Sequence, residues 1–222
     1  ENTLAALRLA HSSGASSVEC DVQLTRDDVP VIIHDDTLDR TTNLSGKLRD
    51  YTYKQIQECD AGSWFSERFS SERIPTLTQW LQLAAELGLS VNLELKGKYH
   101  YPVCIEKVTQ VIETHWPKDR DSPLLSSFSR NIVRRIYQTT RHHFALNIDW
   151  YWLLLPDFVN SSRCLSVHLN NQYVREKQVA RLKQKNKKVY VFTVNDKERA
   201  AQLKRWGVDG IFTDNHTLFN SL

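Results

Sequence analysis

Two stretches decide the fold of this chain: SVECDV at residues 17–22 and SVNLELK at residues 90–96. Both have the apolar character of buried β-strands, and residues i and i+2 of a strand point to the same face. Glu19 and Asp21 therefore share one face of the first strand, and Glu94 interrupts the apolar residues of the second. A carboxylate inside an apolar strand is costly to bury unless it is paired or holds a cation. The pattern predicts that the three carboxylates converge on one site.

The residue types of this predicted site indicate phosphoester chemistry. Three converging carboxylates favour a hard, oxygen-binding divalent cation, either Mg²⁺ or Ca²⁺. Lys96 shares a face with Glu94, and His34 ends a second extended stretch at residues 29–34. A lysine close to a histidine suggests an anionic substrate together with proton transfer. We therefore expect a metal-dependent site that acts on a phosphoester.

The rest of the chain alternates between strand and helix patterns. A clear amphipathic helix begins after Pro75 and ends at Gly88. Strands separated by helical stretches of this length indicate parallel βαβ units. Seven principal strands are expected at 17–22, 90–96, 124–128, 144–148, 164–169, 189–194 and 210–213.

This alternation predicts an α/β fold, a (β/α)₈ TIM barrel. Such a barrel has eight strands, and the chain opens with a helix, so we expect one further strand to precede residue 1. An open doubly wound sheet is the alternative, disfavoured because no glycine-rich phosphate loop follows a strand. The 222 residues suit a single domain, residues 1–222, and the polar stretch at about 36–73 is expected to be an insertion after the second strand.

Composition excludes several functions. A formal net charge of +3 is too small to indicate nucleic-acid binding, and the run at residues 183–188 is expected to be a solvated helix end. The longest apolar patch, at residues 150–155, is too short to span a bilayer, so no stable membrane insertion is expected. The four cysteines are scattered without metal spacing, which favours reduced thiols and a cytoplasmic location. The sequence does not indicate an oligomeric state.

Longer motifs resemble those of the glycerophosphodiester phosphodiesterase family. The run ECDVQLTRDDVPVIIHDDTLDRTT at residues 19–42 resembles the signature of that family. Further matches follow in order along nearly the whole chain. They are AGSWF at 61–65, RIPTL at 73–77, NLELK at 92–96, LSSF at 125–128, VFTVN at 191–195 and WGVDGIFTD at 206–214.

The resemblance implies specific roles for individual residues. Glu19, Asp21 and Glu94 would bind the divalent cation, His34 would be one of two catalytic histidines, and Lys96 would hold the phosphate. The other histidine belongs to a His-Arg-Gly motif at the end of the first strand of the family, and that motif does not occur in residues 1–222. Substrate contacts are expected from Glu1, Trp64, Phe65, His168 and Asn195.

The resemblance also implies a reaction. The glycerol 2-hydroxyl would attack phosphorus, and water would open the cyclic phosphate, releasing glycerol 3-phosphate and an alcohol. One histidine would remove a proton and the other would protonate the leaving group.

Other interpretations of the same residues stay open. Glu19 and Asp21 could instead pair with Lys or Arg in a barrel interior, and Lys96 could be the structural partner of Glu94. Trp64 and Phe65 could simply pack the insertion. Two other functions fit the sequence: a lysophospholipase D or sphingomyelinase D-like phosphodiesterase with an apolar rim at residues 150–155, or a non-catalytic binder of phosphodiester head groups.

Overall fold

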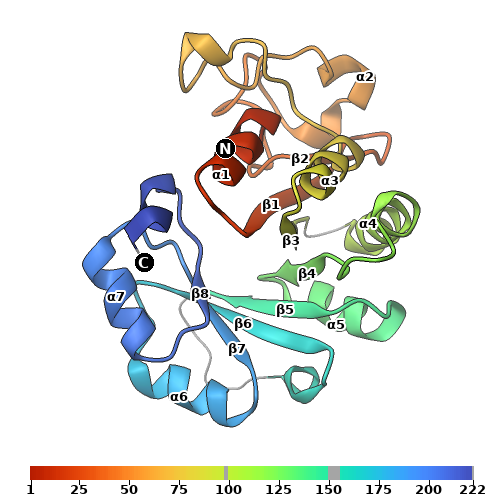
Figure 1. Cartoon of the computed structure of the whole chain (residues 1–222). Helices are drawn as coiled ribbons and strands as arrows, with labels where there is room; N and C mark the ends of the chain where they lie inside the picture. Colours follow the sequence, from red (N-terminus) through yellow and green to blue (C-terminus); the bar gives the residue numbers. More distant parts are fainter. Residues whose placement is uncertain (98–99, 150–155, 222) are drawn as a thin grey trace. The chain divides into compact units, whose positions relative to one another are not determined.

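Strand β1 (Ser17–Leu24) organises the first part of the chain in the computed structural model, which describes residues 1–97, 100–149 and 156–221. The chain divides into two units, Glu1–Pro123 and Leu124–Leu222. In the first unit β1 pairs antiparallel with β2 (Pro30–Ile32) and parallel with β3 (Ser90–Leu95). β1 is therefore the shared strand between an antiparallel hairpin and a parallel βαβ unit (Figure 1).

The parallel register of β1 and β3 confirms the predicted convergence of the acidic residues. Asp21 lies directly opposite Glu94, and Glu19 lies opposite Asn92. The alternate residues of the strands, including Cys20 and Leu93, are buried in the core. One face of this strand pair thus carries carboxylates, while the other contributes to the hydrophobic core.

Three helices accompany these strands: α1 (Leu4–Ser12), α3 (Leu77–Glu86) and α4 (Tyr101–His115). Thr3 caps α1, since its side chain accepts a hydrogen bond from the Ala6 amide. Thr76 and Gln79 form a capping box at the start of α3, just after Pro75, so the helix predicted there is confirmed.

The segment between β2 and α3 contains the region predicted as an insertion at about residues 36–73. It holds three short helices, η1 (Leu48–Asp50), α2 (Tyr53–Ile56) and η2 (Glu67–Phe69). A small hydrophobic core packs it against the end of β2. The buried members of that core are Val31, Ile33, Leu38, Leu48, Ile56, Cys59, Ala61 and Ile74.

The second unit has the repetitive architecture that the sequence predicts. Its strands pair side by side in chain order, and every pair is parallel. Helices α5 (Arg130–Thr139), α6 (Glu176–Gln184) and α7 (Lys197–Arg205) connect or follow them (Figure 1). The strands are β4 (Leu124–Ser127), β5 (Phe144–Ile148), β6 (Cys164–Asn170), β7 (Lys188–Phe192) and β8 (Gly210–Ile211). Two short 3₁₀ helices complete the unit, η3 (Asp157–Asn160) and η4 (His216–Ser221).

The structure differs from the sequence expectation at the second extended stretch. The sequence predicts an extended stretch over residues 29–34, but only Pro30–Ile32 form a strand, and that strand is antiparallel to β1. The hydrogen-bonded ladder ends after the Ile33 amide donates to the Asp21 carbonyl. Beyond that point the chain bends into the insertion, so His34 lies in a bend and not within a strand.

The four cysteines are buried and free, as expected for reduced thiols. Burial raises the pKa of Cys20 well above its usual value, and the neighbouring Glu19 and Asp21 carboxylates raise it further, so this thiol stays protonated. Among the described residues, no helix is both long and apolar enough to cross a bilayer. The apolar patch at residues 150–155 lies outside the described residues.

Leu93 provides a test of the β3 core. Its side chain is 0% exposed, so Leu93→Ala should lower the free energy of unfolding by about 2–5 kcal/mol through lost burial and a residual cavity. The matched control is Leu9→Ala, because Leu9 is 46% exposed on α1. Urea denaturation of both variants measures the difference. Equal losses would contradict the packing described for β3.

Candidate functional site

Three carboxylates meet where β1 and β3 lie side by side. Glu19, Asp21 and Glu94 each offer a carboxylate oxygen, and these atoms all lie within 4.8 Å of one another. Asp21 and Glu94 are buried, whereas Glu19 is exposed. The residues predicted as metal ligands are therefore brought together, with one carboxylate exposed to solvent and two buried. So close a set of like charges is unfavourable unless a cation is present.

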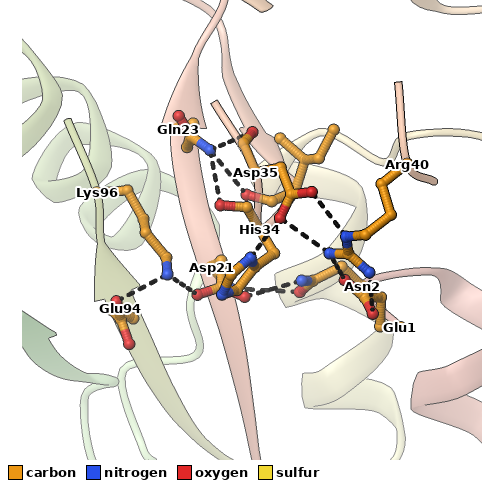
Figure 2. Close-up of polar contacts among 10 residues, drawn as sticks. Glu1, Asn2, Asp21, Gln23, His34, Asp35, Arg40, Glu94 and Lys96 are labelled. Carbon is orange, nitrogen blue, oxygen red and sulfur yellow. Dashed lines mark hydrogen bonds and ion pairs between the residues drawn. The ribbon is translucent and has the colours of Figure 1, made fainter. Parts of the chain in front are cut away.

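Lys96 supplies positive charge to this acidic cluster. Its ammonium nitrogen lies 3.1 Å from a carboxylate oxygen of Asp21 and 3.0 Å from one of Glu94 (Figure 2). Burial alone would lower the pKa of Lys96, but the two carboxylates outweigh burial and raise it, so the ammonium stays charged. Burial raises the pKa of Glu94, Lys96 opposes that shift, and the Asp21 carboxylate adds to it.

Asn2 fixes the orientation of Asp21 from the start of the chain. Its side-chain amide donates to the Asp21 carboxylate at 2.9 Å, and its side-chain oxygen accepts from the Asp21 amide at 3.3 Å. Asn2 adopts φ 55°, a left-handed conformation that asparagine tolerates better than most residues. This two-point contact restrains the Asp21 side chain, while Thr3 caps α1.

A histidine–aspartate–arginine chain lies next to the acidic cluster. The Nδ1 atom of His34 lies 2.6 Å from an Asp35 carboxylate oxygen, and Arg40 donates to both oxygens of the same carboxylate (Figure 2). Hydrogen bonds from Arg40, followed by that from His34, hold the pKa of Asp35 far below its usual range despite partial burial. Asp35 is therefore an acceptor, so Nδ1 carries the proton and Nε2 remains for exchange with a ligand.

Arg40 also reaches Glu1 through two hydrogen bonds. These bonds lower the pKa of Glu1 against the opposing effect of burial, and the charge of Arg40 contributes as well. Arg40 thus connects the carboxylate of Glu1 to the carboxylate of Asp35, which is hydrogen-bonded to His34. Its planar guanidinium suits this double pairing better than an ammonium would.

The aromatic residues predicted to contact substrate lie exposed on the insertion. Trp64 is 41% exposed and Phe65 is 69% exposed. The Trp64 indole donates to the Ala61 carbonyl, and the Arg40 guanidinium lies 5.9 Å from the Trp64 ring centroid. This cation–aromatic contact places Trp64 on the Arg40 side of the site.

A glycine permits the close approach that shapes this aromatic segment. A Cβ atom added at Gly62 would lie 2.1 Å from the backbone oxygen of Phe69, so no larger residue fits there without backbone movement. The turn is also held by the Asp60 carboxylate, which accepts from the Gly62 and Ser63 amides.

The other two predicted contact residues belong to the second unit. His168 is buried in β6, where its Nε2 atom lies 2.9 Å from the Ser166 hydroxyl, and burial lowers its pKa to about 3. The ring is therefore neutral near pH 7. Asn195 is exposed just after β7 and ties that strand to the end of β8, because its side-chain oxygen accepts from the Thr213 hydroxyl and the Asp214 amide.

Sequence reasoning assigned no site role to Asn2, Gln23, Asp35 or Arg40, although each makes hydrogen bonds within or beside the site. Asp35 and Arg40 occur in the motif at residues 19–42, which is the signal that could have suggested them. Asn2 reads equally well as a helix cap, and Gln23 as an ordinary strand residue. Their partners are distant in sequence, so only the folded chain shows them.

Comparisons with known proteins show which family the chain belongs to. The sequence model of the glycerophosphoryl diester phosphodiesterase family matches residues 1–218. The chain is 35% identical to the glycerophosphodiester phosphodiesterase of Caldanaerobacter subterraneus subsp. tengcongensis over 99% of its own length and 91% of that protein. It is 34% identical to the glycerophosphodiester phosphodiesterase of Bacillus altitudinis, over 96% and 89%.

A solved structure is similar to this chain over its whole length. A phosphodiesterase of Oleispira antarctica, in complex with the product sn-glycerol 3-phosphate, superposes with a TM-score of 0.94 at 32% identity, covering 100% of this chain and 90% of that one. The chain belongs to the glycerophosphoryl diester phosphodiesterase family. The family resemblance and the (β/α)₈-barrel fold class predicted from the sequence are confirmed.

The ion pairs of Lys96 generate a stability prediction. Lys96→Met should lower the free energy of unfolding by about 3 kcal/mol at pH 7 in metal-free buffer, because the buried carboxylates of Asp21 and Glu94 lose the ammonium group that pairs with them. The loss should shrink as the pH falls: the pKa of Glu94 is already raised in the folded state, and protonation removes the buried charge.

Urea denaturation at pH 7 and pH 5 measures this effect, with Lys54→Met as the control because Lys54 is exposed on α2. A loss that grows as the pH falls would contradict the assigned role of Lys96.

Proposed function

We propose that the protein hydrolyses glycerophosphodiesters to glycerol 3-phosphate and an alcohol, with a divalent cation and with His34 as a proton-transfer group. The observation that carries this proposal is the acidic cluster of Glu19, Asp21 and Glu94 in the same unit as the His34–Asp35 pair. Two findings support it: the family membership of the chain and the product sn-glycerol 3-phosphate bound by the Oleispira antarctica phosphodiesterase.

The residues fit a divalent cation. The acidic cluster offers only oxygen donors, which Mg²⁺ and Ca²⁺ prefer, and its three negative charges are offset locally by the single charge of Lys96. Glu19, Asp21 and Glu94 would hold the cation, which would polarise a phosphate oxygen and neutralise developing charge. Asn2 keeps Asp21 oriented, and Lys96 reduces the repulsion between these carboxylates and an anionic phosphodiester.

His34 supplies the acid–base chemistry in this proposal. Asp35 accepts a hydrogen bond from the Nδ1–H group, so Nε2 can remove a proton from an attacking hydroxyl or, once charged, return one to a leaving oxygen. Arg40 keeps Asp35 ionised through both steps. The pair therefore holds one tautomer and one ring orientation during catalysis.

The proposal includes several finer assignments. Glu1, Trp64 and Phe65 are proposed to contact substrate. Glu1 and Trp64 both contact Arg40, and the Phe65 ring lies edge-on to the Trp64 ring, which supports a shared binding surface. His168 and Asn195 stay predictions as substrate contacts. We further propose a single barrel domain over residues 1–222 and a cytoplasmic location, the latter because the four buried thiols are unpaired.

Removal of the cation should abolish the reaction. Release of glycerol 3-phosphate from glycerophosphocholine should fall to background in EDTA and return on addition of excess Mg²⁺ or Ca²⁺. Glu94→Gln should lose this activity and also lose the rise in thermal midpoint that the cation gives the wild-type protein, because a ligand charge is gone.

The control for this experiment is Glu86→Gln, on the exposed side of α3. It should keep both the activity and the response of the thermal midpoint. Undiminished hydrolysis in EDTA would refute the cation's role. Lysophosphatidylcholine is assayed in parallel as a second substrate. Hydrolysis of glycerophosphocholine alone indicates a glycerophosphodiesterase, whereas hydrolysis of lysophosphatidylcholine indicates a lysophospholipase D.

Loss of His34 should reduce turnover without removing the cation site. His34→Gln should lower kcat by roughly 10²–10⁴-fold, the usual contribution of a general acid or base. The cation-induced rise in thermal midpoint should persist, because the carboxylates are unchanged. The matched control is His11→Gln, an exposed histidine at the end of α1. Steady-state kinetics decide the outcome, and a kcat within a few-fold of wild type would remove His34 from the mechanism.

A further inference from the structure

Gln23 makes an unusual set of contacts with the backbone that carries His34. Its side-chain nitrogen lies 3.3 Å from the Ile33 carbonyl oxygen, 3.0 Å from that of His34 and 2.7 Å from that of Asp35 (Figure 2). An amide –NH₂ group has two hydrogens, so three carbonyl acceptors share two donors. One side chain thus fixes three consecutive residues.

The position of Gln23 in β1 explains why it can do this. Glu19, Asp21 and Gln23 alternate along the strand and share one face, so the strand that carries two carboxylates of the acidic cluster also carries Gln23. Gln23 is only 7% exposed. A buried amide donor facing carbonyl oxygens makes strong contacts that water does not replace.

The backbone at His34 needs such a contact. The β1–β2 ladder ends where the Ile33 amide donates to the Asp21 carbonyl, and the chain then turns away through His34 and Asp35. The His34 side chain is about half exposed, and among the described residues its ring is hydrogen-bonded to the neighbouring Asp35. Fixing the three carbonyls therefore fixes the direction in which both side chains leave the backbone.

We propose that Gln23 is a positioning residue for catalysis: its amide holds the backbone of residues 33–35 so that His34 faces the acidic cluster. This inference rests on the proposed function of His34. Arg40 and Asp35 restrain the imidazole from the side-chain end, whereas Gln23 restrains it from the backbone. A displacement of about 1 Å at a reacting group can cost roughly 100-fold in rate, so this restraint would be felt in kcat.

The test compares Gln23→Met with Thr25→Val. Methionine keeps the length and burial of Gln23 but has no N–H donor. Thr25 is the matched control, because it is fully buried next to the same strand and its hydroxyl bonds to Asp27 and to the Val29 backbone, not to the segment at His34. Both variants should lose thermal stability. Only Gln23→Met should lower kcat, by roughly 10- to 100-fold, with KM for glycerophosphocholine and the midpoint of Mg²⁺ activation changed less than about threefold.

A spectroscopic measurement makes the test independent of activity. In ¹⁵N-labelled protein at a pH where the imidazole is neutral, wild type and Thr25→Val should show His34 protonated on Nδ1. In Gln23→Met the two ¹⁵N chemical shifts of the His34 ring should move towards their average, as expected for a ring that changes tautomer and orientation. An unchanged His34 spectrum in Gln23→Met, or a kcat loss of the same size in Thr25→Val, overturns the proposal. If the wild-type protein releases no glycerol 3-phosphate, the proposed function fails, while the ¹⁵N comparison still decides the role of Gln23.

Discussion

The parallel register of β1 and β3 is the constraint on which the candidate site depends. It sets Asp21 directly opposite Glu94, so two buried carboxylates face each other across one strand pair. A shift of one residue would turn one of them into the hydrophobic core. The register is in turn specified by that core, because Cys20 and Leu93 must point inward. Packing on one face of the strands therefore fixes the chemistry on the other.

The polar residues around Asp21 and Glu94 reduce the free-energy cost of burying two carboxylates close together. Burial raises the pKa of Glu94, which is the expected response of a carboxyl group in a crowded acidic site. Lys96 offsets part of the repulsion, and Asn2 satisfies the remaining oxygen of Asp21. A cation that binds three carboxylates would relieve the same repulsion more fully.

A second set of contacts serves His34. Ion pairs connect Glu1, Arg40 and Asp35 to the Nδ1 side of the imidazole, and each member of this chain is held by a charge-assisted hydrogen bond. Gln23 acts on the same histidine through the backbone. The insertion contributes Arg40 and Trp64, and its buried apolar residues form a small core with the end of β2. That core holds the loop at a defined position beside the strands.

The sequence by itself determined the alternating α/β pattern, the strands at 17–22 and 90–96, and the acidic cluster with His34 and Lys96 as its neighbours. These features could be predicted because alternation along a strand is local, and because a carboxylate within an apolar run is conspicuous. The antiparallel direction and shortness of β2 could not, since an extended stretch reads the same in either direction.

Only the tertiary structure decided the roles of Asn2, Gln23 and Arg40. Asn2 lies 19 residues from its partner Asp21, and Arg40 lies 39 residues from Glu1. Such pairings depend on how helices and loops pack over the strands, and no periodicity in the sequence records them. The buried, neutral state of His168 likewise follows from its surroundings in β6 and not from its residue type. Residue chemistry is local, whereas the neighbours of each residue are set by the fold.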